Sequence, residues 1–77
     1  SLYPNYTSDI THIQIHNFSP NANYILTLFD LNGRQVKTVN LTSKKSIINL
    51  ADISSGLYHA RITNGKSFSI VKKIIIK

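Results

Sequence analysis

The residues that could perform chemistry in this chain are few, and their positions argue against a catalytic centre. Of the 77 residues only three are acidic, namely Asp9, Asp30 and Asp52. Asp30 precedes an Asn-Gly pair and Asp52 lies in the connection before Gly56, so both are expected to stabilise turns by accepting backbone hydrogen bonds. The chain has no cysteine and no glycine-rich phosphate loop. We therefore expect no enzymatic activity and no cofactor.

The three histidines are the remaining candidates for metal ligands. His12 and His16 fall on the same face of a predicted strand, where four residues span about 13 Å. That distance is too long for both to bind one metal ion, and the spacing does not place His59 beside either of them. We expect exposed strand histidines and no metal site.

Basic residues are the larger chemical feature of the chain. Nine Lys and Arg against three acids give a formal net charge of +6, which favours an anionic partner, although scattered lysines are also typical of a soluble surface. The sequence closes with isoleucines flanked by lysines: Lys72, Lys73, Ile74, Ile75, Ile76 and Lys77. An exposed β edge of this composition could add to another sheet or dock in an apolar groove. The alternative is a buried strand that is solvated at its ends.

The elements that must position these residues are β-strands. Apolar and polar residues alternate from Ile10 to His16, with Ile13 and Ile15 on one face. Further strands are predicted over residues 24–31, 34–41, 46–50 and 57–63 and, as one strand or a pair, over 66–77. The N-terminal stretch before Ile10 is expected to be irregular. No helical spacing is sustained, so the pattern predicts an all-β fold, a small antiparallel β-sandwich of about six to seven strands.

Turns and one core residue complete the predicted framework. Asn32-Gly33 predicts a type I′ hairpin turn, in which both residues have positive φ, and Asn64-Gly65 repeats this pattern. Alternation places Tyr58 in the core, and it breaks at residues 71–73. The structural motif predicted from the sequence therefore consists of Asp30, Gly33, Gly56, Tyr58 and Gly65.

In chain order, several short motifs cover almost the whole sequence. They are Tyr3-Pro4-Asn5-Tyr6, Ile13-Gln14-Ile15, Phe29-Asp30-Leu31-Asn32-Gly33-Arg34, Ile48-Asn49-Leu50, Ser55-Gly56-Leu57-Tyr58 and Lys72-Lys73-Ile74-Ile75-Ile76-Lys77. This succession resembles the type A C-terminal sorting domain of cargo proteins of the type IX secretion system in certain Gram-negative bacteria. The chain departs from the family pattern at Tyr6, where a second proline is usual.

The resemblance implies an immunoglobulin-like sandwich and a role as an export label. Residues 1–77 would be the tail of a larger exported protein, whose N-terminal cargo domain precedes them in the same chain. The tail would be recognised in the periplasm, through residues 72–77, by the outer-membrane shuttle of the system. A sortase-like peptidase would remove it at the surface, near residues 1–3. The expected location is the periplasm in transit, and then the cell surface or the medium.

Other functions are weighed against this one. An accessory carbohydrate-binding or adhesion module would use exposed tyrosines, for which Tyr3 and Tyr6 are the candidates. A nucleic-acid binder would interleave aromatic and basic side chains, but Tyr58 and Phe68 fall in the apolar pattern, so no nucleic-acid partner is expected. No apolar run approaches the ~20 residues of a membrane-spanning helix, so we expect no membrane insertion. The start of the sequence has no signal peptide, so an export signal is expected elsewhere in the protein.

Overall fold

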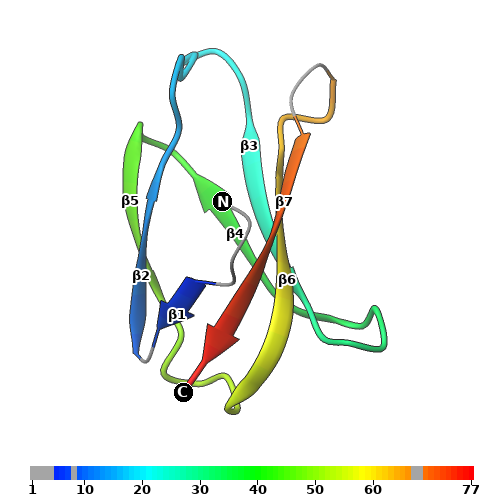
Figure 1. The fold of residues 1–77 in the computed structure, drawn as a ribbon. Coiled ribbons are helices and arrows are strands. Elements are labelled where there is room, and N and C mark those ends of the chain that lie inside the picture. The colour runs from blue at the N-terminus through cyan, green and yellow to red at the C-terminus, as the bar shows by residue number, and fades with distance from the viewer. Residues whose placement is uncertain (1–4, 8, 67–68) are drawn as a thin grey trace.

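The strands follow the alternation of apolar and polar residues along the chain. The computed structural model describes the backbone of residues 5–7, 9–66 and 69–77, and side chains from residue 9 onward within those ranges. The strands are β1 (Asn5–Thr7), β2 (Ile10–Gln14), β3 (Tyr24–Phe29), β4 (Gln35–Leu41), β5 (Lys45–Asn49), β6 (Gly56–Thr63) and β7 (Ser69–Ile76) (Figure 1). In the part of the chain that the structure describes, no helix is long and apolar enough to cross a membrane.

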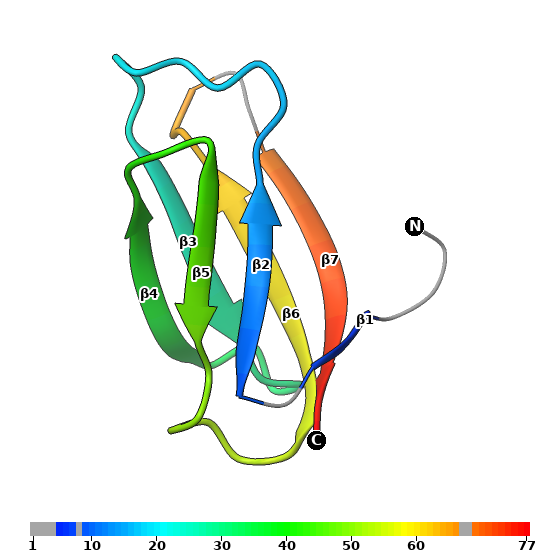
Figure 2. The same ribbon diagram turned by 90° about the vertical axis from the view of Figure 1, so that its left-hand side faces the viewer.

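The strands form two sheets that face each other. The larger sheet has the order β1-β7-β6-β3-β4, and the smaller sheet consists of β2 and β5. Figure 2 shows the smaller sheet in front of the larger one. The predicted all-β sandwich is confirmed, and the described strand pairs are antiparallel except β1 with β7, which run parallel.

Strand β1 corrects the expectation that the N-terminal stretch is irregular. Asn5–Thr7 lies alongside Ile74–Ile76 of β7. The pattern of a strand of three residues is too short to be recognised, because alternation needs four residues or more to stand out. The pairing depends on a partner far away in the sequence rather than on any local signal.

The core is formed by the inward side chains of both sheets. Its buried members are Ile15, Tyr24, Leu26, Leu28, Leu41, Ile48, Leu50, Tyr58, Ile74 and Ile76. The predicted burial of Tyr58 is confirmed, since only 8% of this residue is exposed. Its hydroxyl group donates a hydrogen bond of 2.6 Å to the Ser54 carbonyl, which satisfies the one polar group that the ring brings into the core.

The turn after β3 differs from the predicted type I′ turn. Gly33 has the expected positive φ of 80°, but Asn32 does not have the positive φ that a type I′ turn requires. Among the described residues, the one non-glycine residue with positive φ is Asn17, which lies in another loop. Gly33 N–H donates to the Asp30 carbonyl at 3.0 Å, and Asp30 N–H donates to the Arg34 carbonyl at 2.9 Å. These bonds enclose a three-residue loop, in which a type I turn is followed by a glycine in the left-handed region.

Strands β6 and β7 pair without interruption, so the break in alternation at residues 71–73 does not divide β7 into two strands. The register runs continuously from Gly56 opposite Ile76 to Thr63 opposite Ser69. What breaks is the polarity pattern and not the backbone, because Lys72 occupies a position on the core face.

Candidate functional site

The isoleucines of the predicted recognition segment belong to the core. Ile74 and Ile76 are 6% and 2% exposed, and Ile75 between them is half-buried. This end of β7 is flanked by β6 on one side and by β1 on the other. A partner therefore has no direct access to the side chains of Ile74 and Ile76 in the folded domain.

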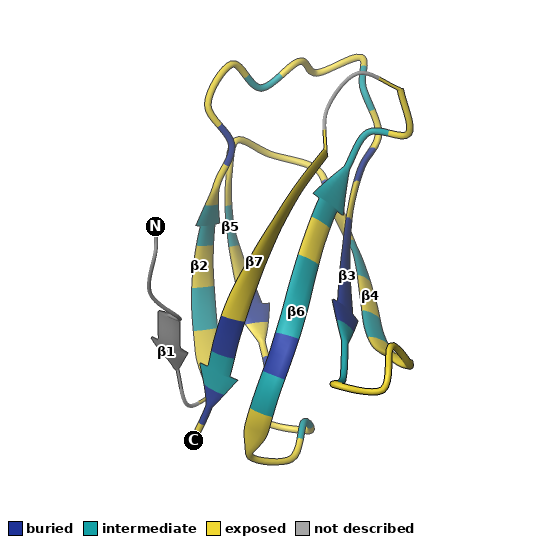
Figure 3. Cartoon of the chain, turned by 45° about the vertical axis from the view of Figure 1, so that its right-hand side comes forward, coloured by how far each residue is buried: buried dark blue, intermediate teal, exposed yellow. Residues whose placement is uncertain are grey.

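The other half of β7 is open, and we call residues 69–73 the open half of β7. All five of these residues are exposed, including Val71 at 57% (Figure 3). Within the described part of the chain they pair with β6 alone, because β1 begins opposite Ile74. The open half therefore presents its side chains and, among the described residues, one backbone edge without a partner strand.

Lys72 and Lys73 point to opposite faces of the larger sheet. Side chains of cross-strand partners lie on the same face of a sheet, as do those two residues apart along one strand. Lys72 lies opposite Ala60, and these two residues are each two positions from Ile74 and Tyr58, which are paired and buried in the core. Lys72 is therefore on the core face and remains exposed there because the smaller sheet does not extend over it. Lys73 lies opposite His59 on the outer face. Lys77 follows β7 and is also exposed.

The structural motif residues predicted from the sequence divide into two groups. Gly56 and Tyr58 lie opposite Ile76 and Ile74 and so hold the buried end of β7. A Cβ on Gly56 would lie 3.5 Å from the Tyr58 ring, at ordinary contact distance. The remaining members, Asp30, Gly33 and Gly65, lie in turns after β3 and after β6. None of the five lies in the open half of β7, so their role is to build the fold.

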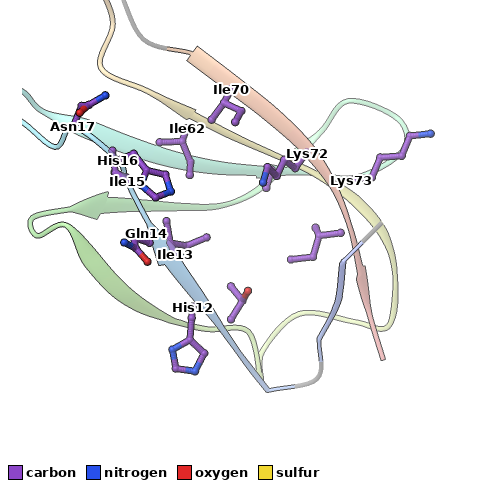
Figure 4. Close-up of a pocket in the computed structure, with 13 residues that line it drawn as sticks. His12, Ile13, Gln14, Ile15, His16, Asn17, Ile62, Ile70, Lys72 and Lys73 are labelled. Atoms are coloured by element: carbon purple, nitrogen blue, oxygen red, sulfur yellow. The ribbon is translucent and has the colours of Figure 1, made fainter. Parts of the chain in front are cut away.

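A cavity of about 410 Å³ opens between β2 and the open half of β7. In Figure 4, Ile62, Ile70 and Lys72 lie between β2 and the β6–β7 pair, whereas Lys73 points away from β2. The wall on the other side is the strand from Thr11 onward, including Ile13. The sequence pattern placed these isoleucines on inward faces, but it gave no sign that a cavity would separate them.

The surroundings of the cavity are positively charged. Two of the chain's three carboxylates pair elsewhere: Asp30 with Arg34 at 3.3 Å and Asp52 with Lys37 at 3.5 Å. In the described part of the chain no ion pair involves Lys72. A carboxylate brought into the cavity from outside would therefore find an ammonium group without a competing acid.

One pKa departs clearly from its usual value, and it lies outside the cavity. The backbone N–H of Arg34 donates to the Asp30 carboxylate at 2.9 Å and lowers the pKa of Asp30 below its ordinary value of 3.8. Desolvation is the second-largest effect and raises this pKa, whereas the Arg34 side chain and the Asn32 N–H lower it further. This low pKa follows from turn formation and is not a sign of catalysis.

The described residues offer neither a metal cluster nor an exposed tyrosine ring. No group of three or more His, Asp or Glu in the described ranges is placed to hold a metal ion. Tyr24 and Tyr58 are buried, so neither can stack on a sugar ring. The expected sugar platforms, Tyr3 and Tyr6, and the aromatic residue Phe68 have side chains outside the described residues.

The comparisons with known proteins give one result that bears on function. The model of the family described as "secretion system C-terminal sorting domain" matches residues 1–77, which is the whole chain. No curated protein matches the chain.

Proposed function

The chain belongs to the family of secretion system C-terminal sorting domains, and on that premise we propose which part of it the secretion machinery contacts. Membership makes the domain a sorting signal of the type IX secretion system, and it implies export to the cell surface or secretion. It also implies interaction with that machinery and with a cargo region on the N-terminal side. The proposal concerns the finer question of how the signal is presented.

In this proposal the lysines of the closing segment contact the machinery, and its isoleucines hold the segment in place. The observation that carries it is the division of β7: Ile74 and Ile76 are buried, whereas Lys72 and Lys73 are exposed on the half of the strand that pairs, among the described residues, with β6 alone. Two exposed ammonium groups on opposite faces favour a partner that carries carboxylates, because complementary charge speeds association and selects the partner.

The route of export is part of the same proposal. The folded domain is recognised in the periplasm by an outer-membrane shuttle of the system, which carries it across the outer membrane. A sortase-like peptidase then cuts near residues 1–3, which lie outside the described residues. The domain is in this view the substrate of an enzyme and not an enzyme itself. The small number of carboxylates and their use in turns and surface ion pairs support that view.

The test is an export assay in a bacterium that has the type IX system. The chain is fused behind a reporter protein that carries its own N-terminal signal peptide, and reporter is measured in the medium, on the surface and inside the cell. Lys72→Glu together with Lys73→Glu should lower export about tenfold, the factor expected for a loss of about 1.4 kcal/mol of binding free energy. Reporter retained inside the cell should rise correspondingly.

The matched control is Lys44→Glu together with Lys45→Glu. These two lysines are also adjacent and exposed, but they lie where β5 begins, away from β7. The control variant should be exported like the parent chain. Equal losses for both double variants would show that total charge matters and not the closing segment. Truncation after Lys72 is a poorer test, because it also removes Ile74 and Ile76 from the core.

A further inference from the structure

The smaller sheet has an outer edge at β2 that no described strand covers. Ile15 N–H donates to the Lys44 carbonyl at 2.9 Å, on the side of β5. Backbone groups alternate sides along a strand, so those of His12 and Gln14 in β2 point to the opposite side. An edge of this kind is a template for pairing with another extended chain.

Apolar surface lies beside this edge, on the core face of the larger sheet. Ile70 is on that face, opposite Ile62, yet 39% of it is exposed. Ile62 is half-buried, and both residues line the cavity of about 410 Å³ next to β2. Five strands face only two, so the part of the larger sheet near β7 lacks a covering strand.

From these observations we infer that an extended segment of the secretion machinery adds to the outer edge of β2 as a third strand of the smaller sheet. The segment has alternating apolar side chains and at least one carboxylate. Its apolar side chains cover Ile62 and Ile70, its backbone pairs with the amides of His12 and Gln14, and its carboxylate meets Lys72. This inference rests on the proposed function and names the partner's chemistry and its binding site.

The charge and the shape of the cavity favour this occupant over a second copy of the domain. Two copies joined along β2 would bring together two Lys72 side chains and two chains of net charge +6, which repel each other. A small anion would satisfy Lys72 but would leave Ile70 exposed and the edge of β2 unpaired. An extended segment with apolar side chains and a carboxylate would pair with Lys72, cover Ile70 and form hydrogen bonds with the edge of β2.

A proline on the free edge tests the strand pairing. Gln14→Pro removes an outward N–H and places a ring where the partner backbone would lie, while the bonds of Ile15 to β5 remain. Ile47→Pro is the matched control, since Ile47 N–H points to the far edge of β5 by the same alternation. In the export assay Gln14→Pro should lower export about tenfold and Ile47→Pro should leave it unchanged.

A second pair of variants tests the apolar surface without altering the backbone. Ile70→Lys places a charge on the cavity wall. Val71→Lys places the same charge one residue further along β7, where the side chain lies on the outer face of the larger sheet. Both residues are exposed in the free domain, so both variants should fold, as checked by circular dichroism. Ile70→Lys should lower export about tenfold and Val71→Lys should not.

The chemistry of the partner is tested with peptides on the isolated chain. A short peptide of alternating valine and glutamate should shift the amide resonances of His12, Gln14, Ile70 and Lys72 in NMR spectra. A peptide of alternating valine and lysine should not. Shifts confined to other strands, no shifts at all, or a dimer through β2 in sedimentation would overturn the inference.

The outcomes of the export assay separate the two proposals. If the parent chain does not export the reporter, the proposed function fails. If the parent chain exports it and Gln14→Pro and Ile70→Lys export equally well, the third strand does not form and the sorting function stands.

Discussion

The two halves of β7 show how one strand divides between folding and recognition. At its far end Ile74 and Ile76 are buried between β1, β6 and the smaller sheet, whereas residues 69–73 are exposed and pair with β6 alone. Both halves continue the same register, so the difference does not come from the backbone. It comes from what lies around the strand in the described part of the chain, where β1 pairs only with Ile74–Ile76 and the smaller sheet has two strands.

This division teaches that the closing segment carries two different kinds of information. Its isoleucines are constrained by packing, so replacing them affects the free energy of unfolding. Its lysines contribute little to packing, so replacing them affects binding and not folding. The variants below separate these contributions, and the free energies of unfolding are measured by urea titration of the isolated chain.

The largest effect on stability is expected for Tyr58→Ala. The ring packs beside Ile74 in the buried half, and its loss should lower the free energy of unfolding by about 3–5 kcal/mol. The hydrogen bond to the Ser54 carbonyl is lost as well. A change below about 1 kcal/mol would mean that the buried half is not the packed region that the structure shows.

A direct comparison of the two halves comes from Ile74→Ala and Ile70→Ala. Ile74 is 6% exposed and Ile70 39%, so Ile74→Ala should cost about 2–5 kcal/mol and Ile70→Ala clearly less, about 1 kcal/mol. Export should respond in the opposite way while the domain remains folded. Equal costs for the two variants would remove the distinction between the halves.

The turn after β3 supplies a stability change that leaves β7 untouched. Gly33 has φ of 80°, which a β-branched residue rarely adopts, so Gly33→Val should cost about 1–3 kcal/mol. Nothing lies within 4 Å of the added Cβ, so this cost reflects backbone strain alone. Export of the folded fraction should be unchanged, and a specific export defect would place recognition at this turn as well.

The smallest effect is expected from Asp30→Asn, and it depends on pH. Because hydrogen bonds lower the pKa of Asp30 in the folded state, its contribution is present above the ordinary value of 3.8 and is lost as the pH falls through the folded value. The variant should be slightly less stable than the parent at about pH 7, and the difference should shrink as the pH falls below the ordinary value of 3.8 and through the lower folded value. A difference that persists at the lower pH would have another origin.

Much of the fold could be predicted because it depends on local patterns. Alternation located six of the strands, and it placed Ile15, Tyr58 and Leu50 in the core. The positive φ of Gly33 was predicted from the same kind of local signal. The turn type was not, because the Asp30 carboxylate accepts from the amides of both Asn32 and Arg34 and so supports a longer loop.

What sequence reasoning missed depends on contacts between distant segments. The parallel pairing of Asn5–Thr7 with β7 joins opposite ends of the chain, and no local pattern announces it. The cavity was missed for the same reason, although Lys72 and Lys73, which line it, belong to the segment predicted for recognition. The open half of β7 and the cavity beside Ile70 exist because the two sheets have unequal numbers of strands, which is a property of the whole fold.

The parallel pairing of β1 with β7 also determines how the domain bears a mechanical load. Asn5 lies beside Ile74 and Thr7 beside Ile76, so a pull at Asn5 and an opposing pull beyond Ile76 act at opposite ends of the pair. The force then acts along the strands and loads their hydrogen bonds together in shear, not one after another. Tension from a protein attached ahead of Asn5 would thus reach the buried half of β7 before it reached the open half.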